Sequence, residues 1–300
     1  MTAGHEVETG VRDLMGRAEF CDQVGEALRA GTGYAAAKLG FTEQAWLQYP
    51  IARASSSGPA LRALEVMLAH RSDRHAGIWP IDMEFLSLFA DRFGEDLHEL
   101  DAIGVVRTAA AAQSEILASL RPPGRPIWFQ DQEPPLNLDE PCWLEHLRGR
   151  RVLLVCPFAS VLAEQASGET YERVWAAVGK PWFEPESVGH LEFPYGFDPA
   201  TRERYATSFD LLDALVAGIG SSDADCVLIA AGSLGQPLAA AAKRAGRVGI
   251  SLGGHLQVLF GVHGARWRGD PFWERIINDA WIGVPERYRP DPAWTDADYW

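Results

Sequence analysis

Residues 225–254, DCVLIAAGSLGQPLAAAAKRAGRVGISLGG, decide the fold class of this chain. The apolar runs DCVLIA (225–230) and RVGISL (247–252) are typical of buried strands, and the alanine-rich segment between them is typical of a helix. A strand, a glycine turn, a helix and a second strand in this order indicate a parallel βαβ unit with a right-handed crossover. The stretch therefore predicts an α/β protein with a Rossmann-like parallel sheet.

The flanking segments extend this prediction. Residues 151–158, RVLLVCPF, add a strand, so we expect the sheet in a C-terminal region, 142–300. Residues 181–200, rich in proline, glycine and aromatic side chains, are predicted to form a substrate-side loop. Residues 1–120 are predicted to be mainly helical, and residues 121–141, with six prolines, to form a linker. The expected helices are 11–30, 59–70, 82–93, 108–120, 159–178 and 208–219.

The charge of the chain bounds its partners. The 300 residues carry a net charge of −14, which disfavours nucleic acid and anionic membranes as partners. Residues 243–289 reverse this balance, with eight basic and four acidic side chains. We expect this basic segment to lie beside an anionic ligand such as a diphosphate, although a solvated face is the alternative for Lys243, Arg244 and Arg275.

The sequence also indicates the compartment. Four cysteines, at spacings unlike a zinc ribbon or a redox pair, are expected to be small core residues. No run of 18 apolar residues occurs, and residues 1–10, MTAGHEVETG, lack the pattern of a secretory leader. A cytoplasmic protein with no integral membrane segment is therefore expected; the oligomeric state stays open.

Two glycine loops follow the strands of the opening stretch. AGSLGQ (231–236) and SLGGH (251–255) leave the carboxyl ends of strands, where ligands bind in parallel sheets. Backbone N–H groups at helix N-termini bind phosphate, although such glycines also serve simple tight turns. Neither the dinucleotide fingerprint nor the Walker A lysine motif is present in the sequence. The candidate phosphate-binding residues are Gly232, Ser233, Gly235, Gly253 and Gly254.

Other candidates flank these loops. Arg266 is placed to bind phosphate, and Trp267 either stacks on a base or sugar or belongs to the core. His255, at the start of an apolar helix, either donates a hydrogen bond to a phosphate or sugar oxygen or caps the helix, and His75 is a candidate for the cleft lining. His263 lies on the other side of that apolar helix, and five histidines show no pairing or spacing typical of a metal site: His5, His70, His98, His146 and His190.

Several segments together carry a family resemblance. The run VGISLGGHLQVLFGVHGARW (248–267) resembles the signature of bacterial polysaccharide-biosynthesis glycosyltransferases with a GT-D-type fold. The similarity spans roughly residues 34–300. It includes KLGFTEQ (38–44), HAGIWP (75–80), RVLLVCPFASVLAEQ (151–165), DCVLIAAGSLGQPLAAAAKRAG (225–246), INDAW (277–281), ERYRP (286–290) and the final Tyr299 and Trp300.

The resemblance implies a retaining sugar transferase that uses a nucleotide-diphosphate sugar as donor and a glycan or glycoconjugate as acceptor. The family's D-x-E motif corresponds to Phe41, Thr42 and Glu43, so Phe41 replaces the first acid and cannot bind a cation. A role for Mn²⁺ or Mg²⁺ therefore stays open, and Glu43 would contact a donor hydroxyl or act as a base. By resemblance, Glu43 and His255 are the catalytic candidates, and Lys38, Gly40, Thr42 and Gln257 join the donor site.

Two alternatives remain at the level of the sequence. The loss of the first acid at Phe41 is also what a non-catalytic nucleotide-sugar-binding or scaffold protein of a glycan pathway would show. The glycine loops alone would also suit another α/β enzyme that acts on a nucleotide or a phosphorylated small molecule.

Overall fold

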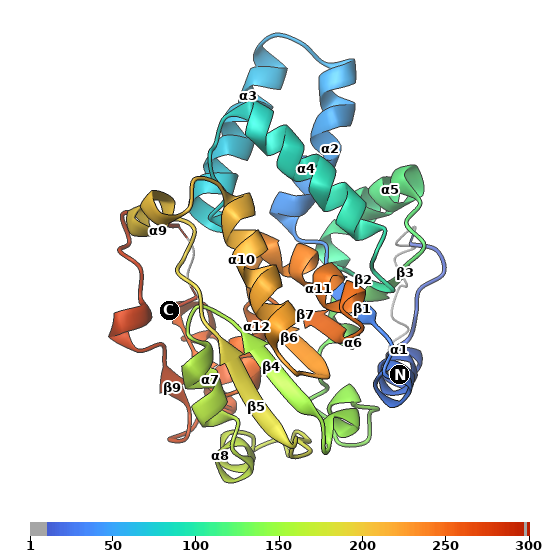
Figure 1. Cartoon of the computed structure of the whole chain (residues 1–300), viewed down its shortest axis with the longest axis vertical. Coiled ribbons are helices and arrows are strands. Elements are labelled where there is room, and N and C mark those ends of the chain that lie inside the picture. Colours follow the sequence, from blue (N-terminus) through green and yellow to red (C-terminus); the bar gives the residue numbers. More distant parts are fainter. Residues whose placement is uncertain (1–10, 297–298) are drawn as a thin grey trace.

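The computed structural model of the chain describes residues 11–296 and 299–300. Its centre is a seven-stranded sheet in the order β3-β2-β1-β7-β6-β4-β5, in which all neighbours run parallel (Figure 1). A short parallel pair, β8 and β9, lies outside it. The strands are β1 (Tyr34–Lys38), β2 (Ala102–Val105), β3 (Arg125–Trp128), β4 (Arg151–Val155), β5 (Ser187–Leu191), β6 (Cys226–Ile229), β7 (Val248–Ser251), β8 (Val262–His263) and β9 (Ile282–Gly283).

Helices cover both faces of the sheet, as an α/β fold requires. One face packs against α1 (Arg17–Ala30), α7 (Ala159–Gln165), α8 (Gly168–Val174) and α12 (His255–Leu259). The other face packs against α2 (Phe41–Ser55), α3 (Pro59–Arg71), α4 (Met83–Leu97), α5 (Ala110–Leu120), α10 (Ser208–Ser221) and α11 (Gly235–Arg244). Two further short helices are α6 (Phe129–Gln132) and α9 (Pro199–Arg204).

Alternation along the central strands feeds both cores. In β4, Val152 and Leu154 belong to one core, whereas Leu153 belongs to the other. Both sets are buried because both faces are covered by helices, which explains why these strands read as continuous apolar runs. The expected α/β class with a Rossmann-like parallel sheet is confirmed at this level.

The sheet is wider than predicted, and this corrects the expectation that it lies in the C-terminal half. Residues 11–120, the described part of the N-terminal region, hold five α-helices, but they also supply β1 and β2, and the expected linker supplies β3. Strand β1 was not predicted because three of the five residues in its sequence, YAAAK, are alanines, which have low β-propensity. Alanine is required there because α11 packs closely: a Cβ on Gly33 would lie 2.1 Å from the carbonyl oxygen of Lys243.

The remaining differences occur at the edges of the sheet. β3 contains Pro126, which an edge strand tolerates because one side of its backbone needs no partner. The opposite edge strand, β5, is largely exposed and lies within the segment predicted to be a loop. The expected helix 159–178 is divided into α7 and α8.

The C-terminal segment returns to the body of the protein, so that Tyr299 and Trp300 pack against one core. Two expectations, that no secretory leader is present and that His5 belongs to no metal site, concern residues 1–10. These residues lie outside the described part of the chain. Within the described residues, no helix combines the length and the apolar character needed to cross a bilayer.

Candidate functional site

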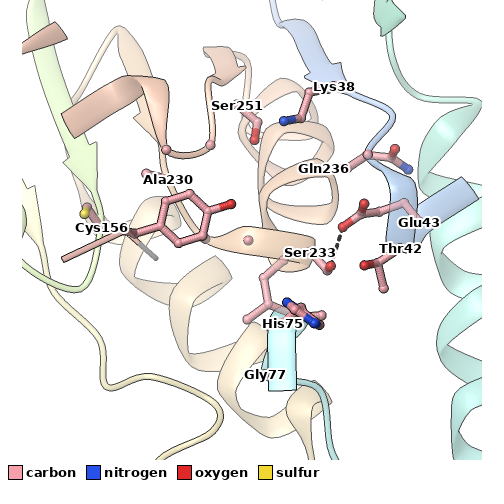
Figure 2. A pocket seen from close by; sticks show the side chains of 18 of the residues that line it. Lys38, Thr42, Glu43, His75, Gly77, Cys156, Ala230, Ser233, Gln236 and Ser251 are labelled. Carbon is pink, nitrogen blue, oxygen red and sulfur yellow. Dashed lines mark hydrogen bonds between the residues drawn. The ribbon is translucent and has the colours of Figure 1, made fainter. Parts of the chain in front are cut away.

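The carboxyl ends of the central strands border a cavity of about 560 Å³. Lys38 ends β1, Ser251 ends β7, and Ala230 and Cys156 follow β6 and β4; Figure 2 shows all four side chains around the same space. The strand order changes direction between β1 and β4, and ligands bind parallel sheets at such a switch point. The cavity volume falls within the range of about 300–1,000 Å³ that is usual for ligand pockets.

Both predicted glycine loops reach this cavity. Gly232 and Gly253 have positive φ angles of 52° and 54°, so each loop turns in a conformation that favours glycine. Gly254 also lines the cavity, and a Cβ on it would lie 2.6 Å from the ring of Tyr299. The second loop and the C-terminal segment are therefore packed together at Gly254, without room there for a side chain.

Residues 40–43, which include the segment that the resemblance aligns with a D-x-E motif, form the facing wall. Gly40, Phe41, Thr42 and Glu43 form the first turn of α2 and all line the cavity. The Ser233 hydroxyl donates a hydrogen bond to Glu43 Oε1, drawn as a dashed line in Figure 2. This bond joins two segments 190 residues apart in the chain.

Gly40 makes room for the carboxylate. A Cβ on Gly40 would lie 2.2 Å from Glu43 Oε2, although the backbone at Gly40 is ordinary extended chain. The absence of a side chain at Gly40 therefore lets Glu43 fold back over the start of its own helix, where the helix dipole favours a negative charge.

Two cations face the cavity. The Lys38 ammonium lies 4.7 Å from the centre of the Phe129 ring, and the Arg266 guanidinium lies 4.1 Å from the centre of the Tyr299 ring. Both are cation–π contacts that position a positive charge on the cavity wall. Lys38 and Arg266 come from opposite ends of the chain, and the cavity brings them together.

The charge pattern differs from the expectation for residues 243–289. Of the eight basic residues in that segment, Arg266 lines the cavity and the other described ones do not. Lys243 and Arg244 bind the carboxylates of Asp101 and Asp96 at the far end of α11. The charge of this segment did not predict the cavity lining at Lys243 and Arg244. These two residues lie at the carboxyl end of α11, and the cavity lies at the opposite end of the strands.

His255 lines the cavity but is already engaged. Its Nδ1 contacts the Oε1 atom of Glu133, and its ring makes an edge contact with Phe129 at 5.4 Å between ring centres. Gln257 also lines the cavity, and its amide nitrogen donates to the carbonyl oxygen of Tyr299 at 2.8 Å. In this structure both side chains therefore hold neighbouring segments in place.

Two predicted site residues lie outside the cavity lining. Trp267 is 3% exposed and belongs to the core, so its indole is not available to stack on a base or sugar. Gly235 lies beneath the loop, where a Cβ would meet the Ser251 hydroxyl at 2.3 Å. Gly235 is required for packing of α11 against β7, not for contact with a ligand.

The cavity also contains polar groups that the sequence did not single out. Gln236 is 3% exposed; its amide nitrogen donates to the carbonyl oxygen of Phe93 at 2.8 Å, and its Oε1 has no partner. The Tyr195 hydroxyl is also buried without a partner, and burial raises its pKa well above the ordinary value. Buried polar atoms are almost always hydrogen-bonded, so these two unpaired atoms call for a hydrogen bond from a ligand or an ordered water.

Sequence signals for these residues exist. Gln236 directly follows the second glycine of the first loop, and Tyr195 lies in the proline- and aromatic-rich segment 181–200. That segment meets the loop containing His75: a Cβ on Gly196 would lie 1.9 Å from the carbonyl oxygen of Gly77. The expected substrate-side loop and His75 both line the cavity.

The lining does not fit a divalent cation of the Mn²⁺ or Mg²⁺ type. Glu43 is its single carboxylate among the described residues, and Phe41, 54% exposed, occupies the other position of the motif. Such ions are held by several oxygen ligands.

Cys156 also lines the cavity, but its thiol is not suited to act as a nucleophile, because burial raises the pKa of this thiol far above neutral pH.

Comparisons of this chain with protein-family models, with curated proteins and with solved structures found no match. The geometry of the cavity is therefore the basis for a functional proposal.

Proposed function

We propose that this protein is a GT-D-type glycosyltransferase that moves a sugar from a nucleotide-diphosphate sugar to a glycan or glycoconjugate acceptor. One observation carries the proposal: two glycine loops, the first turn of α2 and two cations from distant parts of the chain converge on one cavity with unpaired buried polar atoms. The sequence resemblance names the donor class, and the chemistry of the cavity suits it.

Lys38 and Arg266 carry the electrostatic part of this proposal. A departing nucleoside diphosphate accumulates negative charge, which must be neutralised by a metal ion or by cationic side chains and helix N-termini. With a single carboxylate in the lining, the second route is the one that the residues support. Lys38 and Arg266 would hold the diphosphate, with the starts of α2 and α11 directed at it.

Glu43 is the acid–base candidate. Its carboxylate is fixed by Ser233 and has no cationic partner among the described contacts, so it can accept a hydrogen bond from a donor or acceptor hydroxyl. Gln236 Oε1 and the Tyr195 hydroxyl supply two further groups for binding sugar hydroxyls.

Ligand binding is tested first. The purified protein is analysed by native mass spectrometry for a bound nucleotide, and its melting temperature is measured with UDP, GDP and TDP and their sugars, with and without Mn²⁺. We expect one nucleoside diphosphate to raise the melting temperature without Mn²⁺, and Arg266→Ala to abolish the rise. Arg275→Ala, an exposed arginine outside the cavity, is the control. Absence of a shift across the panel would remove the basis of the proposal.

Turnover separates the enzyme from a second candidate, a non-catalytic nucleotide-sugar-binding protein. The single carboxylate and Phe41 in the altered motif favour that candidate. Release of sugar from the donor that binds, lost in Glu43→Gln but retained in Glu84→Gln, supports the transferase; Glu84 is an exposed acid in the first turn of α4. Binding of donor without any release, with every acceptor tried, supports the second candidate.

A further inference from the structure

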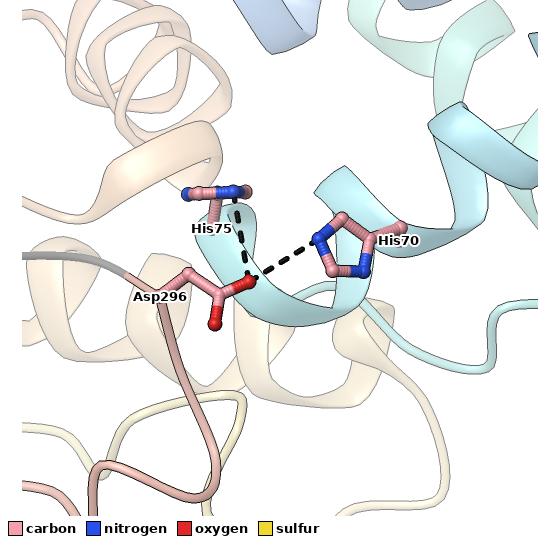
Figure 3. Close-up of side chains that lie close together, drawn as sticks. All are labelled: His70, His75 and Asp296. Atoms are coloured by element: carbon pink, nitrogen blue, oxygen red, sulfur yellow. Dashed lines mark ion pairs between the residues drawn. The ribbon is translucent and has the colours of Figure 1, made fainter.

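At the rim of the cavity, two histidines and a carboxylate meet, and one of the histidines, His75, also lines the cavity. His70 lies near the end of α3, His75 lies in the short helix Ser72–Ala76, and Asp296 lies in the C-terminal segment (Figure 3). His70 Nε2 lies 3.2 Å and His75 Nε2 lies 3.9 Å from Asp296 Oδ2. One ligand atom from each residue falls within 4.8 Å of the others.

The local backbone creates this arrangement. In an α-helix, residues five apart point about 140° away from one another, because each residue turns by about 100°. Residues Ser72–Ala76 instead form a π-helical turn, whose wider i→i+5 repeat returns the chain to the same side after five residues. His70 and His75 therefore face the same space, which is why their spacing in the sequence did not indicate a metal site.

The third residue is oriented by an arginine. Arg74 binds Asp296 Oδ1 at 2.8 Å, and its carbonyl oxygen accepts hydrogen bonds from the Thr295 hydroxyl at 2.7 Å and from the Asp296 N–H at 3.2 Å. These contacts fix the carboxylate and leave Oδ2 directed at the two imidazoles. Carboxylate ligands of metal ions are commonly oriented by such a second partner.

The donor atoms suit a transition-metal ion. Two imidazole nitrogens and one carboxylate oxygen, with a water in the fourth position, form an established ligand set for Zn²⁺. Two ligands about 2.05 Å from a tetrahedral ion lie about 3.3 Å apart. The separations from Asp296, 3.2 Å and 3.9 Å, need changes of a few tenths of an ångström, and the two imidazole nitrogens, which lie within 4.8 Å of one another, need to approach by no more than about 1.5 Å. The exposed side chains can supply these changes by rotation.

We propose that His70, His75 and Asp296 bind a Zn²⁺-class transition-metal ion that fastens the C-terminal segment to the helical rim of the cavity. Asp296 lies three residues before Tyr299, and both Tyr299 and His75 line the cavity. A bound ion would therefore stabilise the wall that Tyr299 and Trp300 form. The proposal is independent of the donor chemistry, because the ion is placed at the rim and no reaction step passes through it.

The test measures metal binding directly. Protein stripped with a chelator is titrated with Zn²⁺ by calorimetry and with Co²⁺ by visible absorption, which reports tetrahedral coordination. We expect one ion per chain, at least tenfold weaker binding in His70→Ala and in Asp296→Asn, and no displacement of Co²⁺ by excess Mg²⁺, which prefers oxygen ligands. His190→Ala, an exposed histidine on β5, should bind as the unaltered protein does.

A second measurement reports the fastening. Zn²⁺ should raise the melting temperature of the unaltered protein and of His190→Ala, but not that of His70→Ala. His70 is exposed and does not line the cavity, so its replacement leaves the nucleotide site intact. Failure to bind Zn²⁺ or Co²⁺, or equal binding in His70→Ala and Asp296→Asn, would overturn the proposal whatever the outcome of the nucleotide experiments.

Discussion

The substitution Gly40→Ala tests how the chain holds Glu43. The added Cβ would lie 2.2 Å from Glu43 Oε2, closer than real Cβ contacts come, and 3.2 Å from its carboxyl carbon, so the carboxylate must shift. The carboxylate must swing away, and its hydrogen bond from Ser233 is then lost. The backbone at Gly40, with φ −78° and ψ 174°, is accessible to alanine, so the contact with Glu43 is what the substitution disrupts.

Gly16 offers a matched control. Gly16 also precedes a helix as its N-cap residue, with φ −86° and ψ 161°, and no atom lies within 4 Å of a Cβ placed on it. Replacement of either glycine by alanine makes a poorer N-cap and lowers the stability by the same amount, at most about 2 kcal/mol. The difference between the two variants therefore isolates the lost contact of Glu43.

The magnitude follows from the type of bond. A hydrogen bond to a charged group contributes about 1.5–3 kcal/mol. The entropy of unfolding is about 2.1 cal/mol/K per residue, or about 0.6 kcal/mol/K for a chain of this length. We therefore expect Gly40→Ala to melt about 2–5 °C below Gly16→Ala.

Differential scanning calorimetry on both variants, on Ser233→Ala and on the double variant Gly40→Ala/Ser233→Ala measures this effect. Since the two substitutions remove the same bond, the double variant should lose less stability than the two single losses added together. Equal melting temperatures for Gly40→Ala and Gly16→Ala, or full additivity in the double variant, would refute the proposed geometry of Glu43.

Two further predictions concern stability. Gly196→Ala should destabilise the protein by about 1–3 kcal/mol in urea denaturation, because its Cβ would meet the carbonyl oxygen of Gly77 at 1.9 Å. By contrast, Gly220 lies within α10 with open space around its Cβ position, so Gly220→Ala should stabilise the protein by about 0.4–1 kcal/mol. Unchanged stability in Gly196→Ala would contradict the packing of the two loops. Hydrogen bonds from Arg151 lower the pKa of Asp225, so this carboxylate stabilises the fold above about pH 4 and the contribution is lost as the pH falls through its folded-state pKa. Asp225→Asn should therefore be less stable than the unaltered protein at pH 7, and this difference in stability should shrink below pH 4. The control is Asp223→Asn, which should change the stability little because the side chain of Asp223 is 82% exposed. A stability difference for Asp225→Asn that stays constant across this pH range would refute the linkage.

The sequence predicted the centre of the fold well. Strands β4, β6 and β7 are continuous apolar runs because helices cover both of their faces, and such runs can be read without knowing the partners. Helices α3, α5 and α10 begin and end within two residues of the expected bounds. Helix α1 ends as expected but begins six residues later than predicted, and α4 ends four residues later. In α1 the predicted stop at Gly31 has a φ of 63°, a left-handed conformation that glycine adopts without strain.

The sequence did not reveal the N-terminal strands, because the residue types in these strands depend on the elements that pack against them. Ala35, Ala36 and Ala37 are weak strand formers, and they are buried in β1 because Ala35 and Ala37 face the core that contains α11, whereas Ala36 faces the other core. Pro126 in β3 likewise looks like part of a linker, and only the position of β3 at the sheet edge makes a strand compatible with it.

For the site, the sequence by itself determined the residue types: the glycine loops, the acid at Glu43 and the cations at Lys38 and Arg266. Only the tertiary structure decided which of them share a space. It placed Trp267 in the core and Gly235 beneath its loop, and it brought Gln236 and Tyr195 into the cavity. The physical reason is that a local pattern fixes how a residue behaves along its own strand or helix, whereas a ligand site depends on distances between segments such as those of Glu43 and Ser233, 190 residues apart.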